Sequence, residues 1–226
     1  MLVSSVDAAR VAHALVTLGA VRVADATPFF YTSGWASPVY VDARVLMSSV
    51  ALRAEVMDIA ARAAAPRVAA SGINAVVGAE SAGIAFAAWL AERLQLPLLY
   101  LRKRPIGWGI TAQLEGRLPD GARVLLVDDV TTDGRSKSGA AAALRQAGTV
   151  VDDALVLLDY ALYPAPATPA TPPDTAALRL HALATWPDLH AALSAQGRLS
   201  PAQAAVLADF AASPVQWSVA HGGIGA

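Results

Sequence analysis

Residues 124–137 read Val-Leu-Leu-Val-Asp-Asp-Val-Thr-Thr-Asp-Gly-Arg-Ser-Lys. The apolar run 124–127 is typical of a fully buried strand, and the adjacent carboxylates Asp128 and Asp129 stand where that strand should end. A loop with hydroxyls and a glycine follows, and residues 138–147 are typical of a helix. Backbone N–H groups of such a loop and helix N-terminus bind phosphate, while ionised carboxylates accept hydrogen bonds from sugar hydroxyls. The stretch therefore predicts a sugar-phosphate site, the other interpretation being an ordinary strand–loop–helix unit with two solvated aspartates.

The composition sets the broad class of the protein. The chain has 226 residues, of which 55% are hydrophobic and 15% are charged, which suffices for one α/β domain with a sizeable core. Its formal net charge of −1 gives no bulk attraction to nucleic acid or to a membrane. The absence of cysteine excludes disulfides and thiolate metal sites and favours a cytoplasmic setting. We see no signal peptide, and the longest apolar stretch, residues 82–91, is shorter than the roughly 20 residues of a membrane span.

Helical and strand patterns alternate along the chain. We predict helices over residues 3–18, 49–65, 83–94, 138–147, 187–195 and 201–211, the second of which ends before Pro66. We predict strands over residues 21–24, 39–46, 75–77, 97–101, 124–127 and 151–158. Residues 103–118 indicate a mobile, glycine-rich loop and residues 163–175 a flexible, proline-rich segment. This alternation predicts an α/β fold with a parallel twisted sheet flanked by helices.

Three loops follow predicted strands of this sheet and carry polar or glycine-rich sequence. They are residues 79–83, 102–116 and 128–136. Because ligands of such sheets bind at the carboxyl ends of the strands, we expect the three loops to meet around one site.

Several segments together resemble a known family. They are FYTSGWASPVY (residues 30–40), GAESAGI (78–84), LRKRPIGWG (101–109) with QLEG (113–116), and the opening stretch 124–137. The last resembles the phosphoribosyl-pyrophosphate (PRPP) motif of type I phosphoribosyltransferases. The others, in this order, are similar to the base-binding signature, the pyrophosphate loop and the catalytic loop of the orotate phosphoribosyltransferase family. The resemblance covers about residues 29–137, and residues 217–223 also look like one branch of the family.

The resemblance implies a reaction and a set of site residues. Orotate would displace pyrophosphate from PRPP to give orotidine 5′-monophosphate, through an oxocarbenium-like transition state that needs cations near the leaving group, Mg²⁺ and a dry site. It assigns to catalysis Arg102, Lys103, Asp128 and Asp129. It assigns to substrate binding Ser33, Gly34, Tyr40, Ser81, Ala82, Gly83, Thr131, Thr132, Asp133, Gly134, Arg135 and Ser136. No residue of the chain is assigned as a metal ligand.

The same resemblance suggests how the chain is organised. It implies a single phosphoribosyltransferase domain with a small base-binding hood (residues 1–46), a PRPP-binding core (47–160) and a C-terminal helical extension (176–226). The family is generally dimeric, so we expect a homodimer. We expect PRPP and orotate as substrates and neither nucleic acid nor a membrane as a partner.

Some positions depart from the family pattern. A second loop lysine is replaced by Ile106, a loop histidine by Trp108, a lysine before Ser-Gly by Thr32, and an arginine that helps to hold orotate by Tyr160. Two alternatives therefore stay open. One is a type I enzyme for another base, such as a purine or uracil, and the other is a PRPP-binding homologue that no longer catalyses.

The lysines are a separate signal. Only Lys103 and Lys137 are lysines, and both lie in segments suspected of binding phosphate. For Lys137 we nevertheless predict a solvent-facing side chain in the first turn of a helix.

Overall fold

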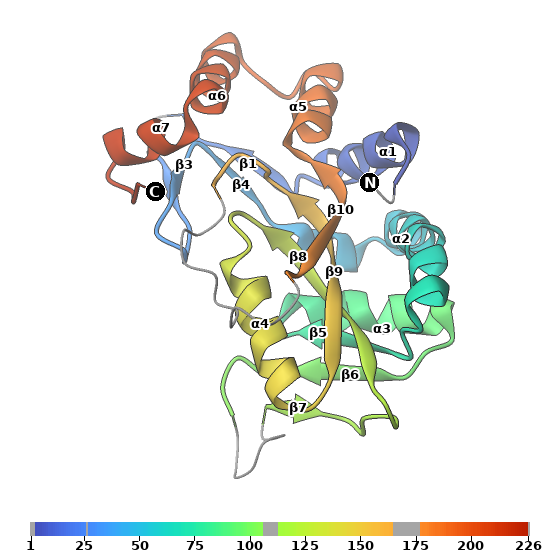
Figure 1. Ribbon diagram of the computed structural model, residues 1–226. Coiled ribbons are helices and arrows are strands. Elements are labelled where there is room, and N and C mark those ends of the chain that lie inside the picture. Colours follow the sequence, from blue (N-terminus) through green and yellow to red (C-terminus); the bar gives the residue numbers. More distant parts are fainter. Residues whose placement is uncertain (1–2, 26, 106–112, 165–176, 226) are drawn as a thin grey trace.

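The computed structural model describes residues 3–25, 27–105, 113–164 and 177–225 (Figure 1). Its centre is a six-stranded sheet with the strand order β10-β9-β8-β5-β6-β7. These strands are β5 (Ala75–Ala79), β6 (Leu98–Leu101), β7 (Leu114–Glu115), β8 (Arg123–Thr131), β9 (Val150–Asp159) and β10 (Arg179–Thr185). All neighbouring pairs are parallel except β6–β7, which is antiparallel. The predicted parallel α/β fold is therefore confirmed.

Helices cover both faces of this sheet. They include α1 (Ser5–Thr17), α2 (Val50–Ser71), α3 (Ala82–Leu94) and α4 (Arg135–Gln146). After β10 follow α5 (Trp186–Ala195), α6 (Pro201–Ala212) and α7 (Pro214–Ala220). Leu125 and Val127 of β8 belong to the core cluster that contains α1, α2 and α3, whereas Val124 and Leu126 belong to the cluster that contains α4. The alternation of side chains along a strand thus supplies both cores from one apolar run.

Small strands precede the sheet in the chain and lie within residues 1–46, the range of the predicted hood. β1 (Val21–Val23) pairs with β4 (Val39–Val41), and β2 (Phe29–Phe30) pairs with β3 (Ala36–Ser37), both antiparallel. The predicted strand 39–46 ends early, because the Asp42 carboxylate accepts a hydrogen bond from the backbone N–H of Arg44 and caps the 3₁₀ helix η1 (Ala43–Ser48). The division into hood, core and extension stays a prediction.

The helix predicted to end before Pro66 instead continues to Ser71. Gly72, in the left-handed conformation with a φ of 63°, ends it. The turn after Pro66 is held from outside the helix, because the guanidinium of Arg67 binds both carboxylate oxygens of Asp153 at 3.1 Å. This contact offsets the backbone hydrogen bond that proline cannot make.

Several elements were not predicted. β2, β3 and β7 are two-residue strands within predicted loops, and η1 replaces the end of a predicted strand. β10 carries Arg179 and His181, so it lacks the apolar run of a buried strand, and α7 begins at Pro214 directly after α6. Within the predicted flexible segment 163–175, Tyr163 is buried against Trp35, and residues 165–176 lie outside the described part of the chain. No helix among the described residues is both long enough and apolar enough to cross a membrane.

Candidate active site

A cavity of about 940 Å³ opens at the carboxyl edge of the sheet. Loops that follow β5, β6 and β8 line it, together with residues of the hood. It contains the predicted residues Ser33, Tyr40, Ser81, Ala82, Arg102, Lys103, Asp128, Asp129, Thr131, Thr132, Asp133, Arg135 and Ser136. The three loops that the sequence placed around one site therefore do meet.

Three predicted glycines, Gly34, Gly83 and Gly134, are absent from the cavity lining. A β-carbon on Gly83 would lie 2.5 Å from the carbonyl oxygen of Val127 and 3.1 Å from the Cα of Asp128. Gly83 thus allows α3 to pack closely against β8 directly beneath the acids. Gly134 precedes α4 in the left-handed conformation, with a φ of 79°, which glycine adopts without strain.

The loop after β8 is held in shape by its own side chains. The Thr131 hydroxyl accepts a hydrogen bond from the Gly134 backbone N–H at 3.2 Å. Asp133 is buried and accepts from the Arg135 backbone N–H at 3.1 Å and from its guanidinium at 2.8 Å. The second oxygen of Asp133 also accepts a hydrogen bond from the indole N–H of Trp35 at 3.0 Å, which ties this loop to the hood. The loop is therefore held in its conformation by hydrogen bonds within the chain.

The paired acids at the end of β8 share one electrostatic environment. Each carboxylate accepts a hydrogen bond from the next backbone N–H, Asp128 from Asp129 at 2.9 Å and Asp129 from Val130 at 2.8 Å. Burial raises the pKa of Asp129 to about 6, and the charge of Asp128 adds to the rise. The Val130 N–H and the Lys137 ammonium act in the opposite direction. A polar ligand that donates hydrogen bonds to this pair would relieve the cost of its ionisation.

The prediction that Lys137 faces solvent was wrong. Its side chain is only 5% exposed, and it turns back beneath the end of β8. The ammonium group lies 2.5 Å from a carboxylate oxygen of Asp128, and it donates to the Val130 carbonyl at 2.9 Å and to the Ser136 hydroxyl at 3.0 Å. A buried acid pair needs a counter-charge, so it draws this lysine inward. The scarcity of lysine in the chain was the signal that pointed to it.

A carboxylate that the sequence did not single out organises the side of the cavity next to α3. Glu80 follows β5, and its carboxylate accepts a hydrogen bond from the Lys103 backbone N–H at 2.7 Å. The Arg102 guanidinium donates to Glu115 of β7 at 2.7 Å, so part of the predicted loop is a short strand. Residues 106–112, which include the departures Ile106 and Trp108, lie outside the described residues.

The hood supplies the remaining wall of the cavity. Tyr31, Thr32 and Ser33 line it, and the Ser33 hydroxyl oxygen is buried without a hydrogen-bond partner. Tyr160 does not line the cavity. It is buried, and its hydroxyl accepts a hydrogen bond from the backbone N–H of Val41 at 3.0 Å, which joins the hood to the end of β9.

Two charged residues of the hood side were also missed. Asp42 and Arg44 line the cavity as a two-point ion pair, with distances of 2.6 and 2.8 Å. Hydrogen bonding from Arg44 outweighs burial and lowers the pKa of Asp42. The short sequence separation of this pair gave no functional signal.

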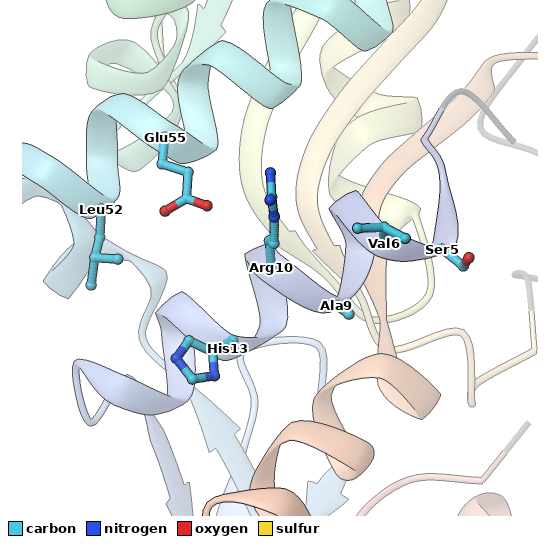
Figure 2. A pocket seen from close by; sticks show the side chains of 7 residues that line it. All are labelled: Ser5, Val6, Ala9, Arg10, His13, Leu52 and Glu55. Carbon is cyan, nitrogen blue, oxygen red and sulfur yellow. The ribbon is translucent and has the colours of Figure 1, made fainter.

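A second cavity, of about 510 Å³, lies between α1 and α2 (Figure 2). Its lining residues are Ser5, Val6, Ala9, Arg10, His13, Leu52 and Glu55. It shares no residue with the first cavity and contains none of the predicted site residues.

Comparisons with known proteins show which proteins this chain is similar to. No protein-family model matches the chain. An orotate phosphoribosyltransferase of Agrobacterium fabrum is 40% identical over 220 residues, which are 97% of this chain and 94% of that protein.

Solved structures agree with that match. The crystal structure of orotate phosphoribosyltransferase from Aeropyrum pernix superposes with a TM-score of 0.64 at 32% identity, over 84% of this chain and 99% of that one. Leishmania donovani UMP synthase superposes with a TM-score of 0.70 at 25% identity, over 91% of this chain, which spans 42% of that longer chain.

The fold is that of a type I phosphoribosyltransferase. The 40% identity extends over nearly the full length of both chains. This chain therefore belongs to the orotate phosphoribosyltransferase family.

Proposed function

We propose that this chain transfers the phosphoribosyl group of PRPP to orotate, giving orotidine 5′-monophosphate and pyrophosphate in pyrimidine biosynthesis. The observation that carries the proposal is one cavity that combines the acid pair, the ordered loop after β8 and the hood. Membership of the orotate phosphoribosyltransferase family supports orotate as the base.

Each end of PRPP has a matching wall. The carboxylates of Asp128 and Asp129 accept hydrogen bonds from the ribose hydroxyls, because an ionised carboxylate can accept hydrogen bonds but cannot donate them. The 5′-phosphate binds at the N-terminus of α4 and to backbone N–H groups of the loop after β8 other than those of Gly134 and Arg135, which donate within the loop. The loop at Ser81 and Ala82 and the N-terminus of α3 face the pyrophosphate.

The transition state places positive charge on the ribose and negative charge on the departing pyrophosphate. Arg102 and Lys103, which line the cavity, stabilise the leaving group, an effect that is strong only where water is excluded. In the present arrangement the Arg102 guanidinium donates to Glu115, so it exchanges this partner for pyrophosphate when PRPP binds.

Mg²⁺ would neutralise part of the pyrophosphate charge when bound. Among the described residues, no three His, Asp or Glu side chains gather where they could hold a metal. We therefore propose that Mg²⁺ enters with the phosphate oxygens of PRPP, as is common for this ion.

Lys137 has a supporting role in this proposal. Its ammonium group binds one carboxylate oxygen of Asp128 and the carbonyl of Val130, so it fixes the acid that the ribose meets. We class it as a positioning residue.

The homodimer expected from the resemblance stays a proposal, and sedimentation at the assay concentration tests it. The cytoplasmic setting stays a prediction.

A panel of bases tests the function directly. The purified chain is mixed with PRPP, Mg²⁺ and one of orotate, uracil, adenine or hypoxanthine, and pyrophosphate release is followed. We expect release with orotate alone. Release only with another base would support the first alternative. Binding of PRPP by calorimetry without release would support the homologue that no longer catalyses.

A further inference from the structure

The wall of the cavity next to the hood is a very short hairpin. β2 and β3 pair over two residues each, and their turn is closed by hydrogen bonds between Tyr31 N–H and the Trp35 carbonyl and between Gly34 N–H and the Tyr31 carbonyl, both 2.9 Å. Tyr31, Thr32 and Ser33 of this turn line the cavity. An isolated hairpin is at best marginally stable in water, so this turn depends on other elements for its position.

A segment from far along the sequence supplies that support. We call residues 218–224 the tail segment. Its first residues, 218–220, are the end of α7, and α7 packs against β3 (Figure 1). The buried Ser218 hydroxyl accepts a hydrogen bond from the Ala36 N–H at 3.0 Å and donates one to the Ile224 carbonyl at 2.8 Å. The Ile224 N–H in turn donates to the Gly34 carbonyl at 3.0 Å.

The packing between the tail segment and the hairpin leaves no spare room. A β-carbon on Gly223 would overlap the Ala36 backbone nitrogen and the Ser218 hydroxyl, and it would lie 2.8 Å from the Ala36 methyl group. A β-carbon on Gly34 would lie 2.9 Å from the Ile224 side chain, and Gly34 has a φ of 94°. The two segments are therefore fitted to each other at the level of single atoms.

The opposite side of the hairpin is attached to the phosphate-binding loop. The indole N–H of Trp35 donates to Asp133, and Trp35 is 1% exposed. The hairpin thus lies between the loop after β8 and the tail segment, and the tail segment is the attachment that contributes nothing to the cavity lining itself.

We propose that the tail segment is a positioning element that holds the turn at residues 31–34 in the conformation that binds the base. The inference deepens the proposed function and rests on it for the identity of the base. If only a fraction of the molecules has the turn in its base-binding conformation, the apparent affinity for the base is reduced to that fraction of its intrinsic value. PRPP, bound at the sheet edge, is not subject to the same loss.

The first test removes the hydroxyl at the centre of the contact. In Ser218→Ala the KM for orotate should rise about tenfold, with kcat and the Kd for PRPP changed less than twofold. Ser194→Ala is the matched control, because that hydroxyl is exposed on α5 and, among the described residues, donates to the His190 carbonyl alone. An unchanged KM for orotate in Ser218→Ala, or an equal loss of affinity for PRPP, would overturn the proposal.

A second pair of variants tests the fit without removing a hydrogen-bonding side chain. Gly223→Ala forces the tail segment away from Ala36, whereas Gly225→Ala meets only a Val219 methyl group at 3.2 Å. Hydrogen exchange of the Ala36 and Gly34 amides should accelerate at least tenfold in Gly223→Ala and stay near wild type in Gly225→Ala. Equal exchange in the two variants would contradict the proposal.

The exchange measurement needs no turnover. If the wild-type chain does not use orotate, the proposed function fails while the exchange result still decides whether the tail segment holds the turn. If the wild-type chain does use orotate and both readouts are unmoved, the proposed function stands and the inference about the tail segment fails.

Discussion

Asp153 with its basic partners and the acid pair Asp128–Asp129 lie on neighbouring strands of the same sheet, and the pKa shifts of Asp153 and Asp129 have opposite signs. Asp153, near the start of β9, is 1% exposed and accepts hydrogen bonds from Arg67, Arg179 and His181 at 2.7–3.1 Å. Burial alone would raise its pKa, but these partners outweigh it and hold the pKa well below the usual range. At the end of β8, Asp128 and Asp129 have Lys137 as their cation, and the pKa of Asp129 rises to about 6.

The difference separates a structural acid from a functional one. The hydrogen-bonding capacity of Asp153 is used by its own chain, so nothing is left for a ligand. The acid pair on β8 lines the cavity, where its carboxylate oxygens can accept further hydrogen bonds. Burial makes ionisation of Asp129 unfavourable, and a hydrogen bond from a substrate hydroxyl offsets that cost. We therefore expect substitutions of the acid pair on β8 to lower activity but not stability, and substitution of Asp153 to lower stability but not activity.

The largest expected effect is on activity at the β8 pair. Asp129→Asn should lower kcat/KM for PRPP about 10²-fold, because a charge-assisted hydrogen bond to a ribose hydroxyl is lost, at about 3 kcal/mol. Stability at pH 7 should stay equal or rise, since a carboxyl with a raised pKa favours the folded state only while it is protonated. Steady-state kinetics and thermal unfolding at pH 7 measure both. A marked loss of stability with activity retained would invert the comparison.

Asp153→Asn should show the reverse profile. We expect the free energy of unfolding to fall by about 2–3 kcal/mol at pH 7, less than for a fully buried pair, because Arg67 and Arg179 are 30% and 47% exposed. kcat/KM of the folded protein should change less than twofold.

The pH dependence of stability checks the same residue. A lowered pKa stabilises the fold above the unfolded pKa of about 3.9 and loses that effect as pH falls towards the folded value. Urea titrations of wild type and variant should therefore converge at acid pH. A constant difference between them from pH 7 to pH 3 would exclude ionised Asp153 as the cause.

Lys137→Met tests whether the ammonium group that binds Asp128 acts through that acid. We expect the Kd for PRPP to rise about 30-fold, or about 2 kcal/mol, by calorimetry. Arg198→Met, on the exposed surface, is the matched control. In an Asp128→Asn background the added cost should shrink to a few-fold, because the partner is already gone. Equal costs in both backgrounds would mean that Lys137 acts only through packing.

The smallest expected effect is the pH dependence of PRPP binding. With the pKa of Asp129 near 6, the carboxyl is about ten to one protonated at pH 5, so affinity should fall about tenfold between pH 7 and pH 5. The phosphate of PRPP also titrates near pH 6. The difference between wild type and Asp129→Asn therefore isolates the carboxyl, and identical slopes in both would contradict the assignment.

Much of the fold follows from local sequence. The apolar run 124–127, the alternation of strands and helices and the three polar loops were enough to predict the sheet and the edge that carries the cavity. The pattern failed where tertiary contacts decide. β10 is a polar-edged strand that Arg179 and His181 join to Asp153, and α2 passes Pro66 because Arg67 binds the same acid.

The site shows the same division. Asp128, Asp129 and the loop after them could be predicted because their chemistry lies within one short segment. Lys137 was singled out only by the scarcity of lysine, and its burial was missed because it follows from the ion pair that its ammonium group forms with Asp128. Glu80 and Ser218 could not be predicted, because each acts on a residue that is distant in the sequence, Lys103 and Ala36 respectively.

The most direct test follows orotate absorbance in parallel for wild type, Asp129→Asn and Asp153→Asn with PRPP and Mg²⁺. We predict PRPP-dependent loss of absorbance in wild type, a rate close to it in Asp153→Asn and a rate about 10²-fold lower in Asp129→Asn. The account would be contradicted by no PRPP-dependent loss in wild type, or by equal rates in the two variants.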